Sequence, residues 1–440
     1  MMDSILAIDV GTQSLKACVI DPELNLLERQ QVPYVPQVKS RDRVELDAEL
    51  LWDALVQACR RLKHRDRLKA MIFSTLCPSL LPLDNEGTPL HPIILHLDRR
   101  SYQQAMWALD RVGNEAFLNI AGNLPVPGGI SATSLLWIRD HKPEIYHKKG
   151  VCFGHAVTFF LKRLTDRFVI EPTNASFTGL YDTVGYGDWD PRLLEPLGID
   201  RKVLPRIISS GSIAGGLIKK AADVVGLPQD IPVIIGANDT TCAAIGAGVI
   251  RSGKMMNTSG TVEILVLCVE EPLVSRDHLL RTHAYPGKWL VMRTVGAGGA
   301  SLEWFRRNFC REMTKKIFYE EYLKRVLSLN GTPEARFQPF LAGDRHRIKR
   351  KSGSFTRLTL NTTREDLLLS LAHGIVSFQF ESIPQWEKSL RLSDRIYHVG
   401  GGASDAYTGY KQGMLRNYTF IQLGETTLTG AAKLAMDAVA

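Results

Sequence analysis

The sequence lacks features that mark several protein classes. It has 7 cysteines in 440 residues, none of them in a C-x-x-C arrangement, so neither a disulfide-stapled scaffold nor a cysteine-based zinc or redox site is indicated. No apolar run reaches the roughly 18–20 residues that span a bilayer, and the N-terminus lacks the basic and long apolar regions of a secretory signal. We therefore expect a cytoplasmic protein in a reducing environment, with no membrane partner.

The motifs of several enzyme classes are also missing. The sequence contains no G-x-S-x-G and no H-E-x-x-H, and its 11 histidines show no metal-ligand spacing, which disfavours a serine hydrolase or a zinc site. No G-x-G-x-x-G follows an apolar run, so a dinucleotide-binding Rossmann domain is disfavoured too. Residues 248–254 fit G-x-x-x-x-G-K, but Met255 replaces the Ser or Thr that contacts Mg²⁺, and Lys254 opens a predicted strand. We therefore reject a P-loop.

The composition is that of a folded globular protein. Hydrophobic residues make up 45% and charged residues 23%, and the length suits two large domains. The net charge of +8 favours anionic partners, but charges of both signs are interspersed, so nucleic-acid binding is disfavoured. The basic run at residues 345–351 is interpreted as a solvated loop.

Hydrophobic periodicity predicts an α/β protein. Apolar runs bounded by turn residues predict strands at 5–9, 15–20, 26–32, 68–76, 80–83 and 92–97. Asp47 precedes apolar residues at helical spacing that continue to Leu62, so it is the expected N-cap of a helix. Residues 102–230 are expected to be mainly helical, with connections rich in Pro and Gly.

The first hairpin has a counterpart in the second half of the chain. Residues 254–258, a Ser259-Gly260-Thr261 turn and residues 262–269 repeat the order of strand, small-residue turn and strand. Two unrelated hairpins would give the same pattern. With other evidence, the repeat favours two related α/β domains that meet near residue 240, each offering a turn to a shared cleft.

Residues 9–16 (DVGTQSLK) combine a carboxylate at the end of a strand, a hydroxyl-rich turn and a cation. Gly11 lets backbone N–H groups approach an anion, and the Thr and Ser hydroxyls can donate to phosphate oxygens. Lys16 adds positive charge, and Asp9 can hold a hydrated Mg²⁺. Taken alone, the segment fits a purely structural turn equally well.

A second carboxylate lies at a turn from strand to helix. Residues 236–241 (GANDTT) precede the small-residue stretch 242–248, which predicts a helix. At this turn Asp239 can take the proton from a substrate hydroxyl as its oxygen attacks phosphorus. An Asp at a helix N-terminus can also be a simple cap, and the local sequence leaves both open.

Two glycine-rich segments follow apolar runs. Residues 296–300 come after 290–295, and residues 400–403 come after 396–399. Because glycine permits close approach of a flat ligand or a phosphate, both segments are candidate nucleotide contacts.

Seven segments, in order along nearly the whole chain, resemble motifs of the FGGY family of carbohydrate kinases: 9–16, 92–101, 236–248, 257–262, 297–306, 339–345 and 399–404. The resemblance implies an α/β fold of two actin-like (ribonuclease H-like) ATPase domains with an inter-domain cleft. Residues 1–240 would carry the sugar site and the first phosphate motif, and residues 241–440 the nucleotide site.

The resemblance also implies roles for individual residues. Asp239 would be the catalytic base and would lie with Asp9 at Mg²⁺, while Asp98, Arg99 and Asp239 would contact the sugar. The residues implied to bind ATP are Gly11, Thr12, Gln13, Ser14, Lys16, Gly260, Thr261, Gly298, Gly401, Gly402 and Ala403. The expected reaction transfers the γ-phosphoryl group of ATP to a hydroxyl of a small sugar or polyol, and a homodimer is left open.

The chain departs from the family pattern on the sugar side. Ketopentose kinases of the family usually carry Gly-Gln-Met-His where this chain has residues 75–78 (TLCP), which argues against xylulose as the substrate. A non-catalytic sugar or nucleotide sensor on the same fold is the alternative function, and an actin-like ATPase is a third. Retention of Asp9 and Asp239 argues against a sensor.

Overall fold

The structure is a computed structural model that describes residues 4–40, 42–329 and 331–439. The chain forms two compact units. Unit 1 consists of Met1–Gly248, Leu280–Trp289 and Thr426–Ala440, and unit 2 consists of Val249–Leu279 and Leu290–Glu425. The sequence suggested one change of domain near residue 240, whereas two later segments of the chain return to unit 1. The assignment of a sugar site and a nucleotide site to separate domains stays a prediction.

A six-stranded sheet forms the centre of unit 1. Its order is β12-β13-β6-β1-β2-β3, with bounds β1 Ser4–Val10, β2 Ser14–Ile20, β3 Leu26–Pro33, β6 Leu68–Thr75, β12 Ile213–Gly216 and β13 Pro232–Asn238. Strands β1 and β2 are antiparallel, whereas β1, β6 and β13 are parallel. Every residue of β1 is buried, as a central strand covered on both faces requires. The strands predicted at 5–9, 15–20, 26–32 and 68–76 are confirmed.

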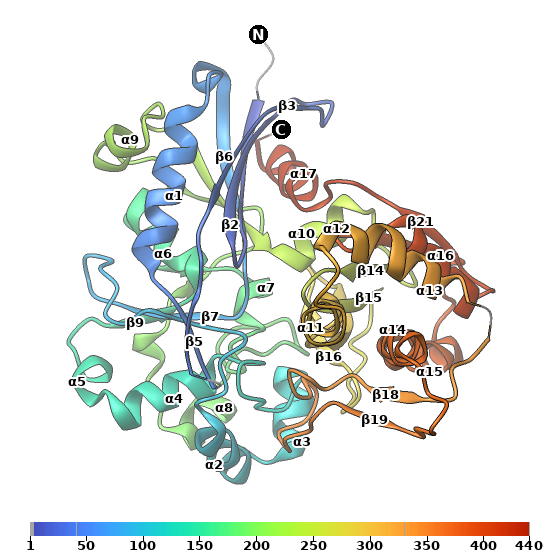
Figure 1. Ribbon diagram of the computed structural model, residues 1–440. Coiled ribbons are helices and arrows are strands. Elements are labelled where there is room, and N and C mark those ends of the chain that lie inside the picture. The colour runs from blue at the N-terminus through green and yellow to red at the C-terminus, as the bar shows by residue number, and fades with distance from the viewer. Residues whose placement is uncertain (1–3, 41, 330, 440) are drawn as a thin grey trace. The chain divides into compact units, whose positions relative to one another are not determined.

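Helices cover both faces of this sheet (Figure 1). Helices α1 (Ala48–Arg61) and α6 (Ala156–Thr165) lie on one face, and α17 (Thr427–Val439) lies on the other beside α10 (Asp239–Gly246). Asp47 caps α1 as predicted, because its side chain accepts a hydrogen bond from the backbone N–H of Glu49. Helix α17 comes so close to α10 that a Cβ atom on Gly430 would lie 1.9 Å from the carbonyl oxygen of Cys242.

The rest of unit 1 contains smaller sheets and helices. Strands β4 (Gln37–Ser40), β5 (Arg43–Leu46), β8 (Ile93–Leu95), β7 (Ser79–Leu83) and β9 (Cys152–Gly154) form one sheet, and β10 (Val169–Ile170) pairs with β11 (Arg206–Ile207). The helices are α2 Tyr102–Val112, α3 Asn114–Ala116, α4 Ala132–His141, α5 Pro143–Tyr146, α7 Pro172–Ala175, α8 Pro191–Leu197 and α9 Lys219–Val225. Helices are thus the main regular structure of residues 102–230, as predicted, but this stretch also contains four short strands.

The strands of unit 2 belong to a sheet of the order β16-β17-β15-β14-β20-β21, in which three of the four residues of the edge strand β16 are assigned to unit 1. The bounds are β14 Met255–Ser259, β15 Glu263–Val269, β16 Leu279–Thr282, β17 Trp289–Val295, β20 Arg395–Val399 and β21 Thr419–Gln422. Strands β14 and β15 are antiparallel, and β14, β20 and β21 are parallel. Apart from one edge strand in each sheet, the order of these strands matches that in unit 1, and the antiparallel hairpin and the parallel strands beside it correspond as well. The internal repeat predicted from the two hairpins is therefore confirmed.

The remaining elements of unit 2 surround this sheet. The helices are α11 Gly299–Phe309, α12 Lys315–Ile317, α13 Leu323–Leu327, α14 Arg364–Phe380, α15 Ile383–Ser389 and α16 Asp405–Met414, and β18 (Arg336–Gln338) pairs with β19 (Ser354–Thr356). In the part of the chain that the structure describes, no helix combines the length and apolar character needed to cross a membrane.

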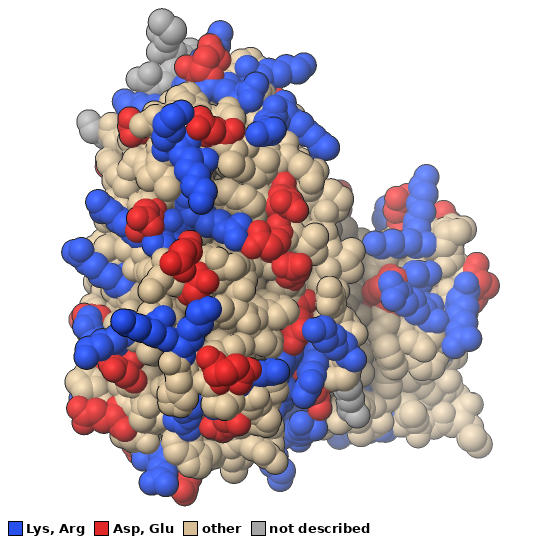
Figure 2. All heavy atoms as spheres, turned by 90° about the vertical axis from the view of Figure 1, so that its left-hand side faces the viewer, with Lys and Arg blue, Asp and Glu red and all other residues tan. Residues whose placement is uncertain are grey.

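The basic run 345–351 is only partly solvated. Arg345 and His346 are 7% and 4% exposed. The ring of His346 lies 3.2 Å from both the backbone N and the backbone O of Thr294, so this end of the run packs against β17. The expectation of a solvated loop therefore holds for Arg347 and residues 349–351, but it is wrong for Arg345, His346 and Ile348, which are buried. Elsewhere on the surface, Figure 2 shows Lys and Arg mixed with Asp and Glu over the face that it draws.

Candidate functional site

Asp9 lies near the carboxyl end of β1, among strands that bring polar groups to it. In the strand register Asp9 is opposite Lys16 on β2 and opposite Ser74 on β6. Lys16 Nζ lies 3.1 Å from one carboxylate oxygen of Asp9, and the hydroxyl of Ser74 donates to the other at 3.2 Å. Asp9 is 6% exposed, so the pair is partly removed from water. The sequence predicted Asp9 and Lys16 together but missed Ser74, which lies in an apolar run.

The turn after β1 is fixed by hydrogen bonds to its backbone, and part of it is exposed to solvent. The backbone N–H of Gly11 donates to the carbonyl of Ser14 at 3.0 Å. Tyr34 donates its hydroxyl to the Gly11 carbonyl at 2.6 Å and its backbone N–H to the Gln13 carbonyl at 3.0 Å. Burial raises the pKa of Tyr34, so the phenol stays a donor. Gln13 is exposed and Thr12 is partly exposed, so a ligand can reach the turn.

Asp239 is the first residue of α10, but it is not the cap of that helix. The cap is Asn238, whose side-chain oxygen accepts from the backbone N–H of Thr241 at 2.9 Å. One oxygen of Asp239, Oδ1, accepts from the backbone N–H of Thr240 at 2.6 Å. Among the described residues, Oδ2 of Asp239 has no hydrogen-bond partner. The alternative of a simple capping Asp is therefore wrong, because Asn238 holds the capping position.

Electrostatics set Asp239 apart from an ordinary surface carboxylate. Burial raises its pKa to about 6, and the negative charge of Asp9 acts in the same direction. Hydrogen bonds from Thr240 and the charge of Lys16 oppose the rise. The strand order explains why these groups interact, because the carboxyl ends of the parallel strands β1, β6 and β13 share one edge of the sheet. A carboxylate with this pKa is ionised at neutral pH and retains basicity.

A buried network behind α10 was missed by the sequence analysis. Thr173 on α7 accepts at Oγ1 from the backbone N–H of Asn238 at 2.8 Å and donates to Glu171 at 2.6 Å. Asn174 also donates to Glu171, through its side-chain amide at 2.7 Å. Burial raises the pKa of Glu171 to about 7. The only local signal was a Glu-Pro pair at the start of a helix, which does not separate a structural from a functional acid.

The predicted sugar contacts Asp98 and Arg99 are held by the protein itself. Asp98 is 1% exposed, accepts from the backbone N–H of Val44 at 2.8 Å and forms an ion pair with Arg100 at 2.7 Å. Arg99 Nη1 donates to three backbone carbonyls, at 2.8 to 3.0 Å. Their contact with a sugar stays a prediction, and these bonds favour a positioning function for Asp98.

In unit 2, the glycine-rich segments converge on the turn of the β14–β15 hairpin. The backbone N–H of Gly299 donates to the carbonyl of Gly260 at 2.9 Å, and that of Gly402 donates to the carbonyl of Ser259 at 2.8 Å. The nucleotide contacts predicted at Gly260, Thr261, Gly298 and 401–403 thus lie together within this unit.

Packing requires glycine at two positions of the glycine-rich segments, Gly298 and Gly400. A Cβ atom on Gly298 would lie 2.3 Å from Cγ of Glu263, and one on Gly400 would lie 2.6 Å from the carbonyl oxygen of Ser259. Gly400 also has a φ of 98°. Gly401 and Gly402 are exposed. Part of the glycine-rich surface is therefore structural, and part is open to a ligand.

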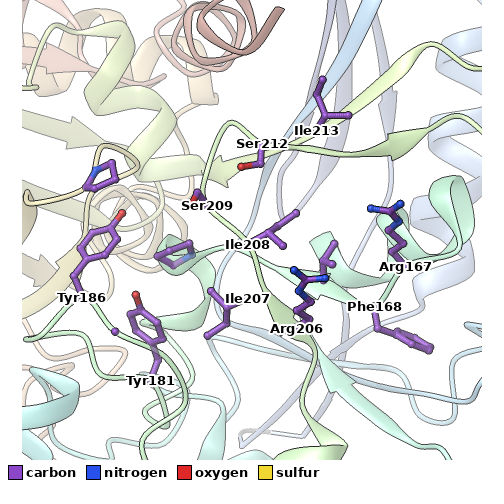
Figure 3. A pocket seen from close by; sticks show the side chains of 14 residues that line it. Arg167, Phe168, Tyr181, Tyr186, Arg206, Ile207, Ile208, Ser209, Ser212 and Ile213 are labelled. Carbon is purple, nitrogen blue, oxygen red and sulfur yellow. The ribbon is translucent and has the colours of Figure 1, made fainter.

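A pocket of about 1000 Å³ lies elsewhere in unit 1 (Figure 3). Arg167 and Arg206 line one side of it, and Tyr181 and Tyr186 line the other. None of the residues predicted from the sequence to bind ATP, sugar or metal lines this pocket. Its nearest link to the network behind α10 is Pro172, which lines the pocket and follows Glu171 in the chain.

Comparisons with known proteins agree with the two-unit α/β architecture. The chain is 26% identical over 412 residues to a xylulose kinase of Staphylococcus xylosus, which covers 92% of this chain and 84% of that protein. It is 27% identical over 446 residues to a glycerol kinase of Thermococcus gammatolerans, with coverage of 98% and 88%. A solved structure of a gluconate kinase from Lactobacillus acidophilus superposes with a TM-score of 0.89 at 21% identity, covering 100% of this chain and 90% of that one.

These likenesses confirm the predicted fold of two actin-like α/β domains. Residues 4–246 match the model of the N-terminal domain of the FGGY family of carbohydrate kinases. That match covers more than half of the chain, and the relatives named above extend the similarity along most of the rest. The chain therefore belongs to the FGGY family of carbohydrate kinases.

Proposed function

We propose that the protein transfers the γ-phosphoryl group of ATP to a hydroxyl of a small sugar or polyol, with Asp239 as the general base. The observation that carries the proposal is that this carboxylate does not cap its helix and has a raised pKa. Asn238 caps the helix in its place, and burial together with Asp9 raises the pKa of Asp239 to about 6. A base with this pKa is ionised at neutral pH and still takes a proton from a hydroxyl as its oxygen attacks phosphorus.

The proposed nucleotide contacts are the two turns that follow corresponding strands of the repeat. Residues 11–14 and Lys16 in unit 1, and Gly260 and Thr261 in unit 2, supply backbone N–H groups, hydroxyls and one cation. Phosphoryl transfer is catalysed mainly by positioning and by stabilising charge, which these groups provide. The exposed Gly401 and Gly402 leave room for the rest of the nucleotide.

Asp9 and Asp239 fit the protein's share of a Mg²⁺–nucleotide site. Mg²⁺ in such sites is held through one or two carboxylates together with phosphate oxygens and water. The charge of Asp9 acts on the pKa of Asp239, so the two carboxylates belong to one electrostatic site. When bound, Mg²⁺ would neutralise charge on the transferred phosphoryl group. Lys16 forms an ion pair with Asp9 at 3.1 Å, and with ATP bound its ammonium group would also contact the phosphates.

The acceptor is proposed only as a class. The relatives named above include kinases of xylulose, glycerol and gluconate, so the family likeness spans a ketose, a polyol and a sugar acid. The choice among such acceptors depends on a few pocket side chains. Residues 75–78, which replace the polar segment of ketopentose kinases, favour an acceptor other than xylulose.

The test is a coupled ADP-release screen over ketoses, aldoses, polyols, sugar acids and deoxysugars, with ATP and Mg²⁺. With the best acceptor, Asp239→Asn is expected to lower kcat by about 10² to 10⁴-fold, because it removes the proton acceptor. ATP affinity should fall far less than kcat, because the variant keeps Asp9 and the phosphate-binding turns although it loses one carboxylate of the proposed Mg²⁺ site.

The matched control is Asp223→Asn, because the side chain of this exposed Asp on α9 pairs with Lys219 on the same helix. The control should keep wild-type turnover. Near-normal turnover of the Asp239→Asn variant would contradict the assignment of the base, and the absence of sugar-dependent ADP release by the wild type would contradict the proposed reaction.

A further inference from the structure

A lysine side chain is fully buried against the β14–β15 hairpin. Lys411 on α16 has 0% side-chain exposure, and its partner Glu263 has 1%. The Nζ atom lies 2.6 Å from Asn257 Oδ1, 2.7 Å from Ser259 Oγ and 2.8 Å from Glu263 Oε2. These three oxygens match the three donors of an ammonium group. The hydroxyl of Tyr407 donates to the other oxygen of Glu263 at 2.9 Å.

All three oxygens belong to the base of the turn that carries Gly260 and Thr261. Asn257 and Ser259 lie on β14, Glu263 is the first residue of β15, and Ser259 is paired with Glu263 in the strand register. One nitrogen atom therefore ties both arms of the hairpin to helix α16.

The rest of this cluster is neutral. Ser259 Oγ lies 2.7 Å from Nε2 of His398, and Nδ1 of that ring lies 2.7 Å from the hydroxyl of Thr408. Because Lys411 donates to Ser259, the hydroxyl proton of Ser259 points to Nε2, which assigns the ring proton to Nδ1. Burial lowers the pKa of His398 to about 3, and the charge of Lys411 adds to the effect. The charged side chains of the cluster are thus those of Lys411 and Glu263; burial lowers the pKa of Lys411, and its contact with Glu263 opposes that shift.

Stability alone is a weak reason for such a pair. Taking both charges out of water costs about as much as their attraction returns, and apolar residues of similar size often stabilise a fold as well. Directional bonds from a buried ammonium do fix the position of their acceptors. The turn depends on such fixed contacts at its base, because its own residues cannot pack against the protein: Gly260 has no side chain and Thr261 is exposed.

We propose that Lys411 is a positioning residue for the Gly260–Thr261 turn, and that its ammonium group fills an oxygen-lined site that a free monovalent cation can occupy when the side chain is shortened. The proposal rests on the proposed function, in which this turn contacts the phosphates of ATP. The ammonium ion is the natural substitute, because it has the same charge and the same kind of N–H donors as the lysine head group.

The experiment compares Lys411→Ala with Lys411→Met in a choline chloride buffer, with and without ammonium chloride. In Lys411→Ala the KM for ATP is expected to rise about tenfold or more, because misplacing a phosphate-binding group by a fraction of an ångström weakens its contacts. The KM for the sugar should stay within about twofold. Ammonium should restore most of the ATP KM in Lys411→Ala but not in Lys411→Met, whose longer side chain fills the space.

The control variant is Lys388→Met, which changes an exposed lysine on α15 of the same unit and should behave as the wild type. Equal increases of the ATP and sugar KM values in a folded Lys411→Ala protein would overturn the positioning role. An ammonium effect of the same size in all three proteins would overturn the cation site. If Lys411→Ala does not fold, Lys411→Met combined with Glu263→Gln leaves no unpaired charge, and an unchanged ATP KM in that protein would overturn the positioning role.

A failure of the proposed function is recognised separately, because the wild type would then be inactive on every acceptor. In that case hydrogen exchange of residues 255–265 replaces kinetics as the readout. Faster exchange of this hairpin in Lys411→Ala, reversed by ammonium, supports the role of Lys411, and unchanged exchange refutes it.

Discussion

Replacing Glu171 by Gln should stabilise the protein at pH 8 and change its stability little at pH 4.5. Glu171 is fully buried, and one of its oxygens, Oε1, accepts hydrogen bonds from Thr173 and Asn174. Among the described residues, Oε2 is buried without a hydrogen-bond partner. A glutamine has the same shape, can keep the accepting oxygen and carries no charge. The substitution therefore isolates the cost of burying the ionised carboxylate.

The magnitude follows from the pKa of this group. Burial raises the pKa of Glu171 from 4.5 to about 7. The folded protein then holds a proton that the unfolded chain releases, so the wild type loses stability as pH rises from 4.5 through 7 and levels off above that range. One pKa unit corresponds to about 1.36 kcal/mol, so the loss is about 3 kcal/mol for this fully buried group.

The assay is urea denaturation of both proteins at intervals from pH 4.5 to 8.5. The difference in free energy of unfolding at each pH cancels titrations that both proteins share. It should grow in favour of the Gln variant to about 3 kcal/mol by pH 8. Glu195→Gln, on an exposed position of α8, is the control and should give no such growth. A pH-independent difference, or a Gln variant that is less stable at pH 8, would refute the reasoning.

Two further predictions concern Asp239 and helix α17. Because the pKa of Asp239 is about 6 and the base must be ionised, kcat/KM should fall about tenfold per pH unit below that value; a profile that is flat from pH 8 to pH 5 would contradict the role of Asp239. Gly430→Ala should lower the free energy of unfolding by about 3 kcal/mol, because its Cβ would lie 1.9 Å from the Cys242 carbonyl oxygen. Gly409→Ala, with no atom within 4 Å, should instead be neutral or stabilising by up to about 1 kcal/mol in urea denaturation, and equal effects would contradict the packing argument.

Local patterns were sufficient for much of the fold. The strands of both hairpins and helix α1 with its Asp47 cap follow from periodicity and turn residues, which act over a few neighbouring positions. The return of α17 to unit 1 could not be predicted in this way. An apolar helix face indicates that the helix packs against something, and only the tertiary structure shows which sheet it covers.

The same division holds for the candidate site. Asp9 and Lys16 could be paired from the sequence, because a short hairpin turn fixes which residues lie opposite each other. The raised pKa and the free position of Asp239 could not be predicted from the sequence. They depend on Asn238 taking the capping position and on the approach of Asp9 from another strand. The buried Lys411 gave no signal in the sequence, because its partners Asn257, Ser259 and Glu263 are remote in the chain. Glu171 bonds to its near neighbours Thr173 and Asn174, but its burial depends on the packing of other segments around it.

The sequence by itself determined the supply of reactive groups and the order of the segments that carry them, and that order was enough to indicate the family. The tertiary structure alone decided which carboxylate has a raised pKa and which residue caps helix α10. It also decided which charges are buried. The physical reason is that pKa and hydrogen bonding depend on burial and on neighbours across space, whereas local sequence encodes only the spacing along one strand or helix.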